Sequence, residues 1–393
     1  MSHMDQTRLL RPIIACLIAA LAGCQLIAPA PAPRPIPVAQ LPGWSDDDLA
    51  GIEAAIEQQC TVAPKRLPAG WAPLCAEFAQ LPAQSGDATP PLRDWIERRF
   101  DAWPLLDDSG GSQGLITGYY EPLLTGSRVR ESERQVALHR RPDDLLTIEL
   151  DAVEPRLKGL RLRGRLEGTK VVPYWSRSEI QDKAPLPGAE LIWVDDAVDA
   201  FFLQIQGSGR VRLRDGTELR VGYADQNGHP YRAIGRELIE AGALRREEVT
   251  APAIKAWLRA NPQRAADVMN SNRSYVFFRE LPAPAARARE LGPPGSLGVP
   301  LAPMRAIAVD RRVVPLGSLV WLDTFDPIDS QPLRRLVAAQ DTGGAITGPI
   351  RADLFWGFGE RAERGAGLMK SPGRMWMLWP RGQTPPAREA PKN

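Results

Sequence analysis

The chain has 393 residues, of which 44% are hydrophobic and 24% charged, so it is long enough for two domains with cores and is far from a disordered composition. Its 49 lysines and arginines nearly balance 47 aspartates and glutamates, without the dense basic runs that grip phosphate backbones, so nucleic acid is not an expected partner. Proline, with 38 residues, is about twice as frequent as its average share of about 5%, which favours a loop-rich, mainly β chain.

Residues 1–23 have the pattern of a signal peptide, because two arginines precede an apolar run that is too short to span a bilayer. The run ends in LAGC, which resembles the lipobox of bacterial lipoproteins. This resemblance implies cleavage before Cys24 and a lipid anchor on its thiol; an ordinary signal peptide cleaved nearby would leave Cys24 incidental. Residues 24–43 are rich in proline and predict a stiff, extended tether between a membrane and the first domain.

The remaining cysteines and the histidines limit the possible chemistry. In an exported protein Cys60 and Cys75 form either a disulfide or two buried thiols, and the sequence leaves both alternatives open. The three histidines, His3, His139 and His229, lie far apart, so neither a cysteine-histidine zinc cluster nor an HExxH helix can be written. The sequence therefore predicts no metal and no cofactor, disfavours a serine-histidine triad, and leaves carboxylates as the expected catalytic groups.

The first elements are predicted to be helical. Residues 45–56 (SDDDLAGIEAAI) predict an amphipathic helix capped by the serine and aspartates at its start. Residues 91–100 predict a second helix that turns its leucine, tryptophan and isoleucine inward. Residues 115–127 (LITGYYEPLLTGS) then alternate as a strand that breaks at its proline and second glycine.

The middle of the chain is predicted to be rich in strands and then helical. ELIWV, AFFLQIQGSGRVRL and ELRVGY predict strands, and the Asp215-Gly216 turn before the last is a hairpin signal. In the second of these strands Gln204 and Gln206 would lie on the same face and need a partner or a ligand. Residues 231–270 change to a helical period, with breaks at Gly242 and Asn261-Pro262.

The last part returns to strands. After a proline-rich connection over residues 280–296, strands are predicted at MRAIAVD, PLGSLVWLDT, RRLVAAQD and RMWMLWP. Residues 339–360 (AQDTGGAITGPIRADLFWGFGE) contain five glycines and two aspartates, and predict a loop that is neither a regular helix nor a regular strand. Residues 381–393 predict a loose tail.

Three aspartates in this last part are candidates for catalysis. Asp310 and Asp341 each follow a short apolar strand, where a carboxylate can project into a cleft, and Asp353 lies in RADLFWG. Each aspartate also has a purely structural alternative. Asp310 can pair with the arginines that follow it, Asp341 can bond the backbone of its own turn, and Asp353 can cap a short helix.

Several motifs occur together in the order of a known family. GYYEP, LQIQGSGR, YVFF, AIAVDRRVVPLGSLVWLD and AQDTGGAITGPIRADLFWGFG closely resemble the membrane-bound lytic murein transglycosylase A family, whose C-terminal part is named for three aspartates. Asp310, Asp341 and Asp353 match these three. The resemblance implies a mainly β fold with a few short helices, in which residues 44–125 and 281–380 form a double-psi β-barrel. It also implies that residues 126–280 form an inserted β-rich domain, with a substrate groove between the two.

The implied activity is that of a peptidoglycan lytic exotransglycosylase, which needs no cofactor. The C6 hydroxyl of N-acetylmuramic acid attacks C1 and gives a 1,6-anhydro product, so one carboxyl can serve first as the acid and then as the base. Asp353 is assigned this role because its segment is also similar to the HFDL stretch of barwin-like endoglucanases, although Arg351-Ala352 replaces His-Phe. Apolar neighbours should raise the pKa of Asp353, and Arg351 is expected to point away from it. Asp341 is expected to support it, and Asp310 to be structural or supporting.

The family motifs also suggest substrate contacts and partners. The candidates for sugar binding are Tyr119, Tyr120 and Glu121, then Gln206, Gly207, Ser208 and Gly209, and the loop glycines Gly343 and Gly344. For each of them a packing or turn role is equally open. The chain is expected to be a monomer, and its expected partners are peptidoglycan strands, cell wall synthesis and division proteins, and, through the lipid anchor, the periplasmic face of the outer membrane. Two alternatives remain: a hydrolase on the same barrel with Asp341 activating water, and an inactive murein-binding lipoprotein.

Overall fold

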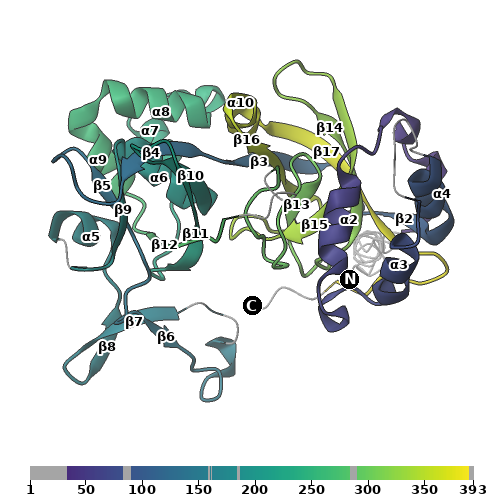
Figure 1. Cartoon of the computed structure of the whole chain (residues 1–393), viewed down its shortest axis with the longest axis horizontal. Helices are drawn as coiled ribbons and strands as arrows, with labels where there is room; N and C mark the ends of the chain where they lie inside the picture. Colours follow the sequence, from purple (N-terminus) through teal and green to yellow (C-terminus); the bar gives the residue numbers. More distant parts are fainter. Residues whose placement is uncertain are drawn as a thin grey trace, which may run out of the picture.

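The structure is a computed structural model that describes residues 33–82, 90–157, 160, 162–183, 186–283 and 290–388 (Figure 1). The predicted signal peptide and Cys24 lie outside these residues. Within them no helix is long and apolar enough to cross a membrane. The helices are α2 (Ile52–Cys60), α3 (Trp71–Phe78), α4 (Pro90–Arg99), α5 (Arg177–Lys183), α6 (Ala197–Gln206), α7 (Ile234–Glu240), α8 (Ala251–Ala260), α9 (Pro262–Asn270) and α10 (Glu360–Leu368). Short 3-10 helices lie at Val38–Gln40, Trp44–Asp46, Pro64–Arg66, Pro155–Leu157 and Arg246–Glu248.

Strands form most of the framework, in agreement with the predicted mainly β class. They are β1 (Ile36–Pro37), β2 (Phe100–Pro104), β3 (Gly114–Glu121), β4 (Leu123–Ser127), β5 (Val136–His139), β6 (Leu146–Ile148), β7 (Leu162–Glu167), β8 (Lys170–Pro173), β9 (Glu190–Val194), β10 (Ser208–Arg212), β11 (Glu218–Gln226), β12 (Val276–Glu280), β13 (Ala306–Val309), β14 (Leu319–Phe325), β15 (Pro332–Asp341), β16 (Arg351–Phe358) and β17 (Lys370–Pro380).

The largest sheet closes on itself. Its strand order is β1-β2-β17-β14-β15-β13-β16-β3. Strand β17 also pairs with β3, so the strands from β17 to β3 in this order form a closed ring, and β1 and β2 lie outside it. Strands β3 and β16 are parallel, as are β13 and β15, although each pair is separated in sequence by other elements. The strands of this ring come from both ends of the described chain, so the segment between β3 and β13 leaves the ring and returns to it.

The intervening segment forms a second sheet with the order β12-β11-β10-β4-β9-β5, and a small sheet β6-β7-β8. Figure 1 shows two lobes: the ring with α2, α3 and α4 forms the first lobe, and β4 to β12 with α5 to α9 form the second, from which β6, β7 and β8 project. Strand β4 belongs to the second sheet, so the change of sheet falls at Pro122, slightly before the boundary expected at residue 125.

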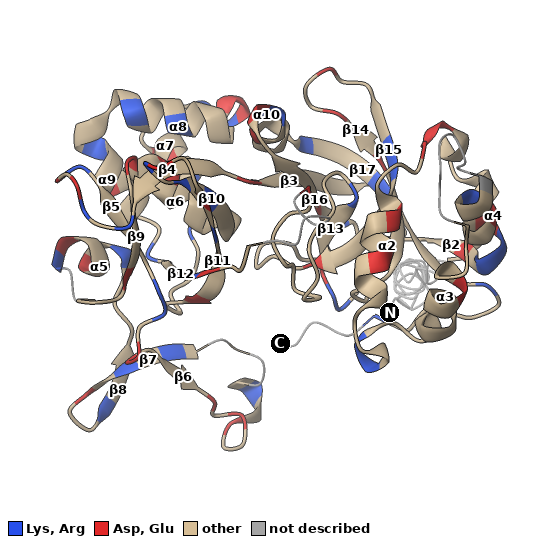
Figure 2. Cartoon of the chain, viewed as in Figure 1, with Lys and Arg blue, Asp and Glu red and all other residues tan. Residues whose placement is uncertain are grey.

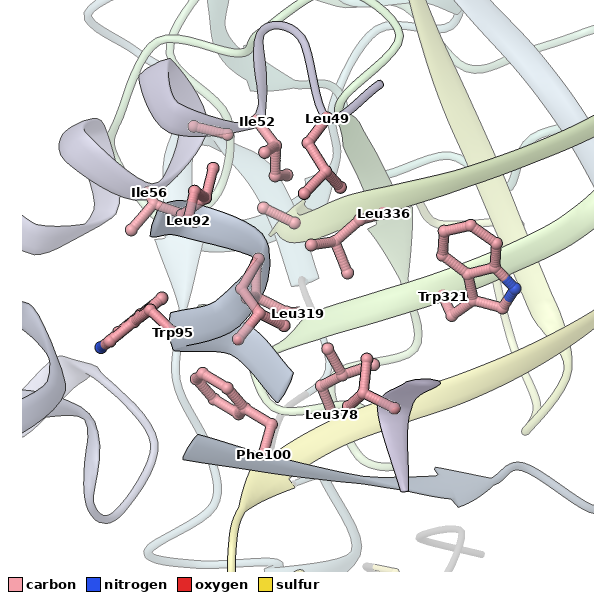
Figure 3. Close-up of a cluster of buried hydrophobic side chains, with 14 of the residues drawn as sticks. Leu49, Ile52, Ile56, Leu92, Trp95, Phe100, Leu319, Trp321, Leu336 and Leu378 are labelled. Carbon is pink, nitrogen blue, oxygen red and sulfur yellow. The ribbon is translucent and has the colours of Figure 1, made fainter. Parts of the chain in front are cut away.

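One buried cluster ties the N-terminal helices to the ring. The side chains of α2 and α4 pack against Leu319, Trp321, Leu336 and Leu378, which come from β14, β15 and β17 (Figure 3). The predicted helix over residues 91–100 is confirmed as α4, because its leucine, tryptophan and isoleucine are buried in this cluster. Burial of apolar surface of this kind contributes roughly 25 cal/mol per Å² and holds the helices on the outer face of the ring.

The first predicted helix begins later than expected. Residues Trp44–Asp46 form a 3-10 turn and α2 starts only at Ile52, so the aspartates do not cap it. The reason is that Asp47 is needed elsewhere: its carboxylate accepts hydrogen bonds from both terminal nitrogens of buried Arg305, each at 2.7 Å, and from the Leu336 amide at 2.8 Å. A buried arginine requires such a partner, since its charge is otherwise costly to desolvate.

The predicted tether and tail are shorter than residues 24–43 and 381–393. Strand β1 pairs with β2, and Val38 and Leu41 are buried in the first lobe, so the part of the tether from Ile36 onward belongs to the fold. In the tail, the Arg381 amide donates to the Arg99 carbonyl at 2.8 Å, so the start of the tail is attached to the fold.

The two alternatives for the cysteines are resolved. Cys60 and Cys75 form a disulfide that joins the end of α2 to α3.

The stretch AFFLQIQ, predicted as a strand, is the helix α6, so this prediction is wrong. Asp196 caps the helix by accepting hydrogen bonds from the amides of Val198 and Asp199, and Gly207 ends it in the left-handed conformation with φ of 81°. This pair of cap signals outweighs the β propensity of the phenylalanines. Gln204 and Gln206 therefore do not share a strand face.

Other predictions in the second lobe are confirmed. Strands β10 and β11 form the expected hairpin around Asp215-Gly216. Helix α8 starts after Thr250, whose hydroxyl caps it, and α9 starts with Pro262 after the break at Asn261. In the first lobe the four predicted C-terminal strands are β13, β14, β15 and β17. The expected loop over residues 339–360 is wrong in part, because Asp341 ends β15, Asp353 lies inside β16, and α10 follows.

Candidate active site

Two of the three candidate aspartates lie in one row across the ring. Ala308 on β13 is the cross-strand partner of Asp341 on β15 and of Asp353 on β16, and Asp353 is in turn the partner of Thr117 on β3. Cross-strand partners project from the same face of a sheet. The four side chains therefore lie side by side, with only the methyl group of Ala308 between the two carboxylates.

The row lies on the outer face of the ring. The neighbouring residues Ile307, Leu354 and Ile116, one position along each strand, belong to the buried cluster on the other face. Strand alternation thus fills one face with apolar side chains and turns the carboxylates to the opposite face. Both Asp341 and Asp353 are half-buried there.

Asp353 combines burial with few hydrogen bonds. Among the described residues its carboxyl accepts a single hydrogen bond, which the Thr117 hydroxyl donates to Oδ1 at 2.6 Å. Burial raises the pKa of Asp353 to about 6, partly opposed by the Thr117 hydrogen bond and the Arg351 charge and assisted by the charge of Asp341. The pKa is therefore raised as the sequence analysis expected. A carboxyl with such a pKa can give up and take back a proton near neutral pH.

The apolar surroundings differ from those expected. Leu354 faces the interior of the ring, and Trp356 packs there against Gly118 and α10. Phe355 instead packs against Tyr119, with 5.2 Å between the ring centroids. The guanidinium of Arg351 donates to the backbone carbonyls of Leu115 and Ala352, at 3.3 and 2.6 Å, which holds its charge along the strand edge.

Asp341 accepts four hydrogen bonds and is held much more firmly. Its Oδ1 accepts from the amide and hydroxyl of Ser296, both at 2.9 Å, and from the Thr342 amide at 2.8 Å, while its Oδ2 accepts from the Tyr119 hydroxyl at 3.0 Å. Burial raises the pKa of Asp341 against these hydrogen bonds. The same burial and the two carboxylates raise the pKa of Tyr119 far above its usual range, so its hydroxyl stays protonated and donates.

Asp310 lies away from this row and has another task. Its carboxylate accepts from Arg312 Nε at 2.9 Å, from Arg312 Nη2 at 2.6 Å and from the Gly348 amide at 2.9 Å. The Arg312 hydrogen bonds lower the pKa of Asp310 to about 2. Asp310 thus fastens the segment between β15 and β16 through the Gly348 amide.

Ser296 ends the stretch over residues 280–296, which was predicted only as a connection, yet it donates two hydrogen bonds to Asp341. Gly295 lets this segment approach β15: a Cβ atom there would lie 2.6 Å from the Gln340 carbonyl oxygen and 3.2 Å from the Asp341 Cβ. Of the two predicted loop glycines, Gly343 is tight against Ile346, whereas Gly344 is exposed with open space where a side chain would be. Of these two glycines, Gly344 is therefore the one with open space beside its backbone.

The GYYEP motif forms a joint between the lobes, apart from Tyr119. Glu121 is fully buried and accepts from Arg210 Nε at 2.9 Å and from Arg220 Nε at 3.2 Å, both in the second lobe. This burial argues against the predicted sugar contact by Glu121. Tyr120 is also buried, and its hydroxyl donates to Glu363 Oε1 at 3.1 Å.

The same joint includes Lys255 on α8. Its Nζ donates to Glu363 Oε1 at 2.8 Å and to the Tyr120 hydroxyl at 3.2 Å, and it pairs with Asp199 Oδ1 at 3.2 Å. Figure 2 shows basic residues on α8 and acidic residues on α10 where the two helices meet. A largely buried ammonium group needs such partners, and these contacts link the two lobes at this point.

The QGSG motif is a helix end rather than part of one strand. Gln206 Oε1 accepts from the Tyr120 amide at 3.1 Å, and Gly207 ends α6. Ser208 and Gly209 begin β10, where a side chain on Gly209 would lie 2.3 Å from Leu203 Cδ1. These contacts explain much of the motif through packing, although Gln206, Gly207 and Ser208 are half-buried and only Gly209 is buried.

A separate hollow of about 550 Å³ lies in the second lobe between α6, α7 and α8, lined by Phe202, Ile205, Ile234 and Ile254 among others. It contains neither aspartate. In the described residues no group of three or more histidine, cysteine, aspartate or glutamate side chains could hold a metal ion.

Sequence reasoning missed Thr117 and Ser296. Neither stands in a recognisable motif, and their roles depend on strand pairings and a loop approach between residues more than forty positions apart. Thr117 does lie two positions before Tyr119 on the same strand, so strand alternation would have placed both on one face. Strand alternation was therefore the one signal in the sequence that could have identified Thr117 as a neighbour of the site.

Comparison with known proteins supports a single family. Residues 115–279 match the MltA specific insert domain and residues 305–379 match the 3D domain. The chain is 31% identical to membrane-bound lytic murein transglycosylase A of Escherichia coli K12 over 287 residues, which are 71% of this chain and 69% of that relative. It is 32% identical to the Vibrio cholerae protein of the same name over 304 residues, which are 73% and 74% of the two chains.

Solved structures agree. MltA from Neisseria gonorrhoeae superimposes with a TM-score of 0.77 at 35% identity, covering 92% of this chain and 98% of that one. The lytic transglycosylase LtgG of Burkholderia pseudomallei gives a TM-score of 0.61 at 42% identity, with coverage of 90% and 96%. Escherichia coli MltA with bound chitohexaose gives 0.65 at 25% identity, with coverage of 86% and 91%.

Proposed function

Because the chain belongs to the membrane-bound lytic murein transglycosylase A family, we propose that Asp353 is the acid and then the base of its reaction. The chain is a peptidoglycan lytic transglycosylase. What the family does not decide is which carboxyl carries the proton. The answer follows from the different hydrogen bonding of the two aspartates in the row.

The observation that carries the proposal is the contrast between Asp353 and Asp341. Asp341 accepts four hydrogen bonds, so both of its oxygens are already engaged with donors that favour the charged form. Asp353 accepts one, on Oδ1, from the described residues and has a pKa of about 6. A general acid needs a proton to give and an oxygen free to reach the substrate, and Asp353 meets both needs.

The reaction then proceeds in two proton transfers through one group. Protonated Asp353 donates to the glycosidic oxygen as the bond to C1 of N-acetylmuramic acid breaks, and it becomes a carboxylate. The carboxylate then takes the proton of the C6 hydroxyl as that oxygen bonds to C1, which yields the 1,6-anhydro product and restores the acid. No water enters the balance, and the negative charge of Asp341 nearby favours the oxocarbenium-like transition state.

The alternative of a hydrolase receives less support. A hydrolase of this kind would need a second carboxylate with a free oxygen to activate water or to attack C1. Asp341 is the other carboxylate of the row, and its oxygens are occupied by Ser296, Thr342 and Tyr119. The arrangement therefore suits a reaction that needs one working carboxyl.

We also propose the finer architecture that the family implies. The closed ring of strands has the parallel and crossed pairings expected of a double-psi β-barrel, and the segment from β4 to β12 corresponds to the inserted domain. A glycan strand would lie between the two lobes, over the row of aspartates. Escherichia coli MltA has been solved with chitohexaose bound, which supports binding of a β-linked glycan.

The relatives are named as membrane-bound, and we propose that this chain reaches the membrane through Cys24. Lipidation at Cys24, followed by Gln25, would direct it to the periplasmic face of the outer membrane. The short proline-rich stretch before Ile36 would then separate the anchor from the first lobe. Cell wall synthesis and division proteins remain expected partners on the basis of family resemblance alone.

The test is mass spectrometry of the soluble products that the purified chain releases from murein, with Asp353→Asn and Asp341→Asn beside it. We expect disaccharide-peptides one water lighter than the hydrolysis products. Asp353→Asn should lose more than about a hundredfold in rate, while Asp341→Asn keeps residual activity. Products with reducing ends would make the chain a hydrolase, and an active Asp353→Asn protein would move the acid to another residue.

A further inference from the structure

We infer that Thr117 is a positioning residue for Asp353, and that its hydroxyl directs the catalytic proton to the Oδ2 oxygen of that carboxyl. The inference rests on the proposed role of Asp353. It concerns a residue outside the family motifs from which the site was predicted. It follows from one short hydrogen bond and from the strands that hold the two residues.

The geometry of the pair is fixed by the backbone. Thr117 and Asp353 are cross-strand partners in the parallel pairing of β3 with β16, and the neighbouring pairs Ile116 with Ala352 and Gly118 with Leu354 continue this register. Threonine is β-branched and has restricted χ1 rotation in a strand. The hydroxyl is therefore held 2.6 Å from Oδ1 without needing any movement of the substrate.

This contact makes the two carboxyl oxygens unequal. A hydroxyl has one proton to donate, and Oδ1 accepts it at a distance typical of a hydrogen bond to a charged oxygen. When Asp353 is protonated, its proton is best placed on Oδ2, because a proton on Oδ1 would compete with the one from Thr117. The acid form therefore presents its proton from one defined oxygen, as proton transfer in a fixed geometry requires.

The same contact should set the pH range of the acid. The Thr117 hydrogen bond stabilises the carboxylate and lowers the pKa of Asp353, against the larger effect of burial. The other charged or titratable groups near this face are Arg351 on the same strand, Asp341 on β15 and Tyr119 on β3.

Two further groups lie nearby but are placed differently. Lys370 on β17 is the cross-strand neighbour of Thr117 and is exposed. The charged residues of α10 lie behind the strand, because α10 packs on β3 through Gly118, on the other face. None of these groups changes when Thr117 is replaced by an uncharged residue.

The experiment compares Thr117→Val, which keeps the shape and removes the hydroxyl, with Thr117→Ser, which keeps the hydroxyl. Release of soluble product from murein is measured at limiting substrate from pH 4 to pH 8. The acid works only when protonated, so the wild-type rate should fall as pH rises through about 6. Thr117→Val should move this fall upward by about one pH unit and reduce the low-pH rate by about tenfold. Thr117→Ser should restore both the pH at which the rate falls and the rate at low pH. If the Thr117→Val protein does not fold, Thr117→Ala takes its place in the comparison.

A Thr117→Val protein with an unshifted pH profile and an undiminished rate would overturn the inference. So would a Thr117→Ser protein as impaired as the valine variant, since that would reduce Thr117 to a packing role. Asp353→Asn separates this failure from that of the proposed function. If Asp353→Asn is inactive while Thr117→Val behaves as wild type, only the positioning role is lost, and if Asp353→Asn is active, both are overturned.

Discussion

Asp353 has a pKa of about 6 in the folded chain, against 3.8 for an ordinary aspartate, and burial is the main cause. A group whose folded pKa lies above its unfolded pKa stabilises the folded state fully at low pH, and this stability is lost as pH rises through the folded pKa. Above pH 6 the buried carboxylate is therefore a cost to the fold. A shift of this size corresponds to at most about 3 kcal/mol, and partial exposure of the side chain reduces it.

We therefore expect Asp353→Asn to raise the free energy of unfolding at pH 7 by about 1 to 2 kcal/mol while it abolishes activity. Asparagine keeps an oxygen for the Thr117 hydroxyl and removes the buried charge. Urea unfolding at pH 4 and pH 7 would measure this, and the gain should shrink at pH 4. In Asp341→Asn, the contrasting variant, four hydrogen bonds to the carboxylate are disturbed, so this protein should lose stability. An Asp353→Asn protein that loses stability equally would contradict the assignment.

At this scale the sequence predicted the strands around the candidate aspartates better than it predicted the residues that surround their carboxylates. The alternation around Asp341 and Asp353 can be read from the chain, but the register that brings both beside Ala308 depends on two strand pairings. Ser296 reaches Asp341 from a stretch without hydrophobic periodicity. Glu121 illustrates the opposite error: it stands in a family motif, yet its charge is neutralised by two arginines more than eighty residues away.

At the scale of elements, local signals succeeded where they were strong and not in conflict. Thr250 and Pro262 mark the starts of α8 and α9. The strand predicted for AFFLQIQ is wrong because the phenylalanines favour a strand, whereas Asp196 and Gly207 at the two ends of this stretch favour a helix. The predicted start of α2 is wrong for another reason, since Asp47 and Asp48, which would have capped a helix, bind Arg305, which lies 258 and 257 residues away in sequence.

The disulfide is an element-scale feature with a measurable effect. Cys60 and Cys75 join α2 to α3 across 15 residues, and closing a loop of this length restricts the unfolded chain by about 3 kcal/mol. We expect the double variant Cys60→Ser and Cys75→Ser to lower the free energy of unfolding by about 2 to 3 kcal/mol, measured by urea unfolding. Its activity at low temperature should be unchanged, because α2 and α3 pack on the first lobe away from the second (Figure 1).

Wild-type protein treated with a reductant is the control for the serine substitutions. It should match the double variant if the bond itself is what stabilises the fold. A reduced wild type as stable as the oxidised one would show that α2 and α3 are held by the cluster of Figure 3 without help from the bond.

At the scale of the whole molecule, two charged side chains near Tyr120 connect the lobes: the carboxylate of Glu121 and the ammonium group of Lys255. Glu121 extends from the end of β3 to Arg210 and Arg220 of the second lobe, and Lys255 extends from the second lobe to Glu363 of the first. Glu121 and its two arginines are buried or nearly so, whereas the Glu363 side chain is 50% exposed, so only the Glu121 contacts are buried pairs. Breaking a buried pair by removing one partner costs about 3 to 5 kcal/mol, so such contacts favour one relative orientation of the lobes.

This arrangement could not be read from the sequence. Periodicity reports which face of an element is buried, but says nothing of which charged residue on one lobe will meet which on the other. The family resemblance predicted an inserted domain, and thus two lobes, without the contacts that hold them. Lys255 lies in the middle of a helix among alanines and apolar residues, where a solvated lysine is the usual expectation.

We expect Lys255→Met to impair the use of murein more than the chemistry. The substitution keeps the length of the side chain and removes the charge that holds Glu363, Tyr120 and Asp199 together. If the relative orientation of the lobes shapes the glycan site, the KM for murein should rise about threefold to tenfold, while the pH at which the rate falls stays near 6. Arg236→Met is the matched control, because its pair with Glu240 is exposed and within the second lobe.

The combined variant Lys255→Met with Glu363→Gln decides whether the effect belongs to the joint. Two residues that act through one contact should show a coupling of about 1 kcal/mol or more in unfolding free energy, and the double variant should bind murein no worse than the worse single one. Additive losses would mean that each residue stabilises its own helix. An unchanged KM in Lys255→Met, with stability alone reduced, would mean that the lobes hold the glycan site in shape without this contact. The orientation would then depend on Glu121 and its two arginines, which the same cycle with Glu121→Gln and Arg220→Met can test.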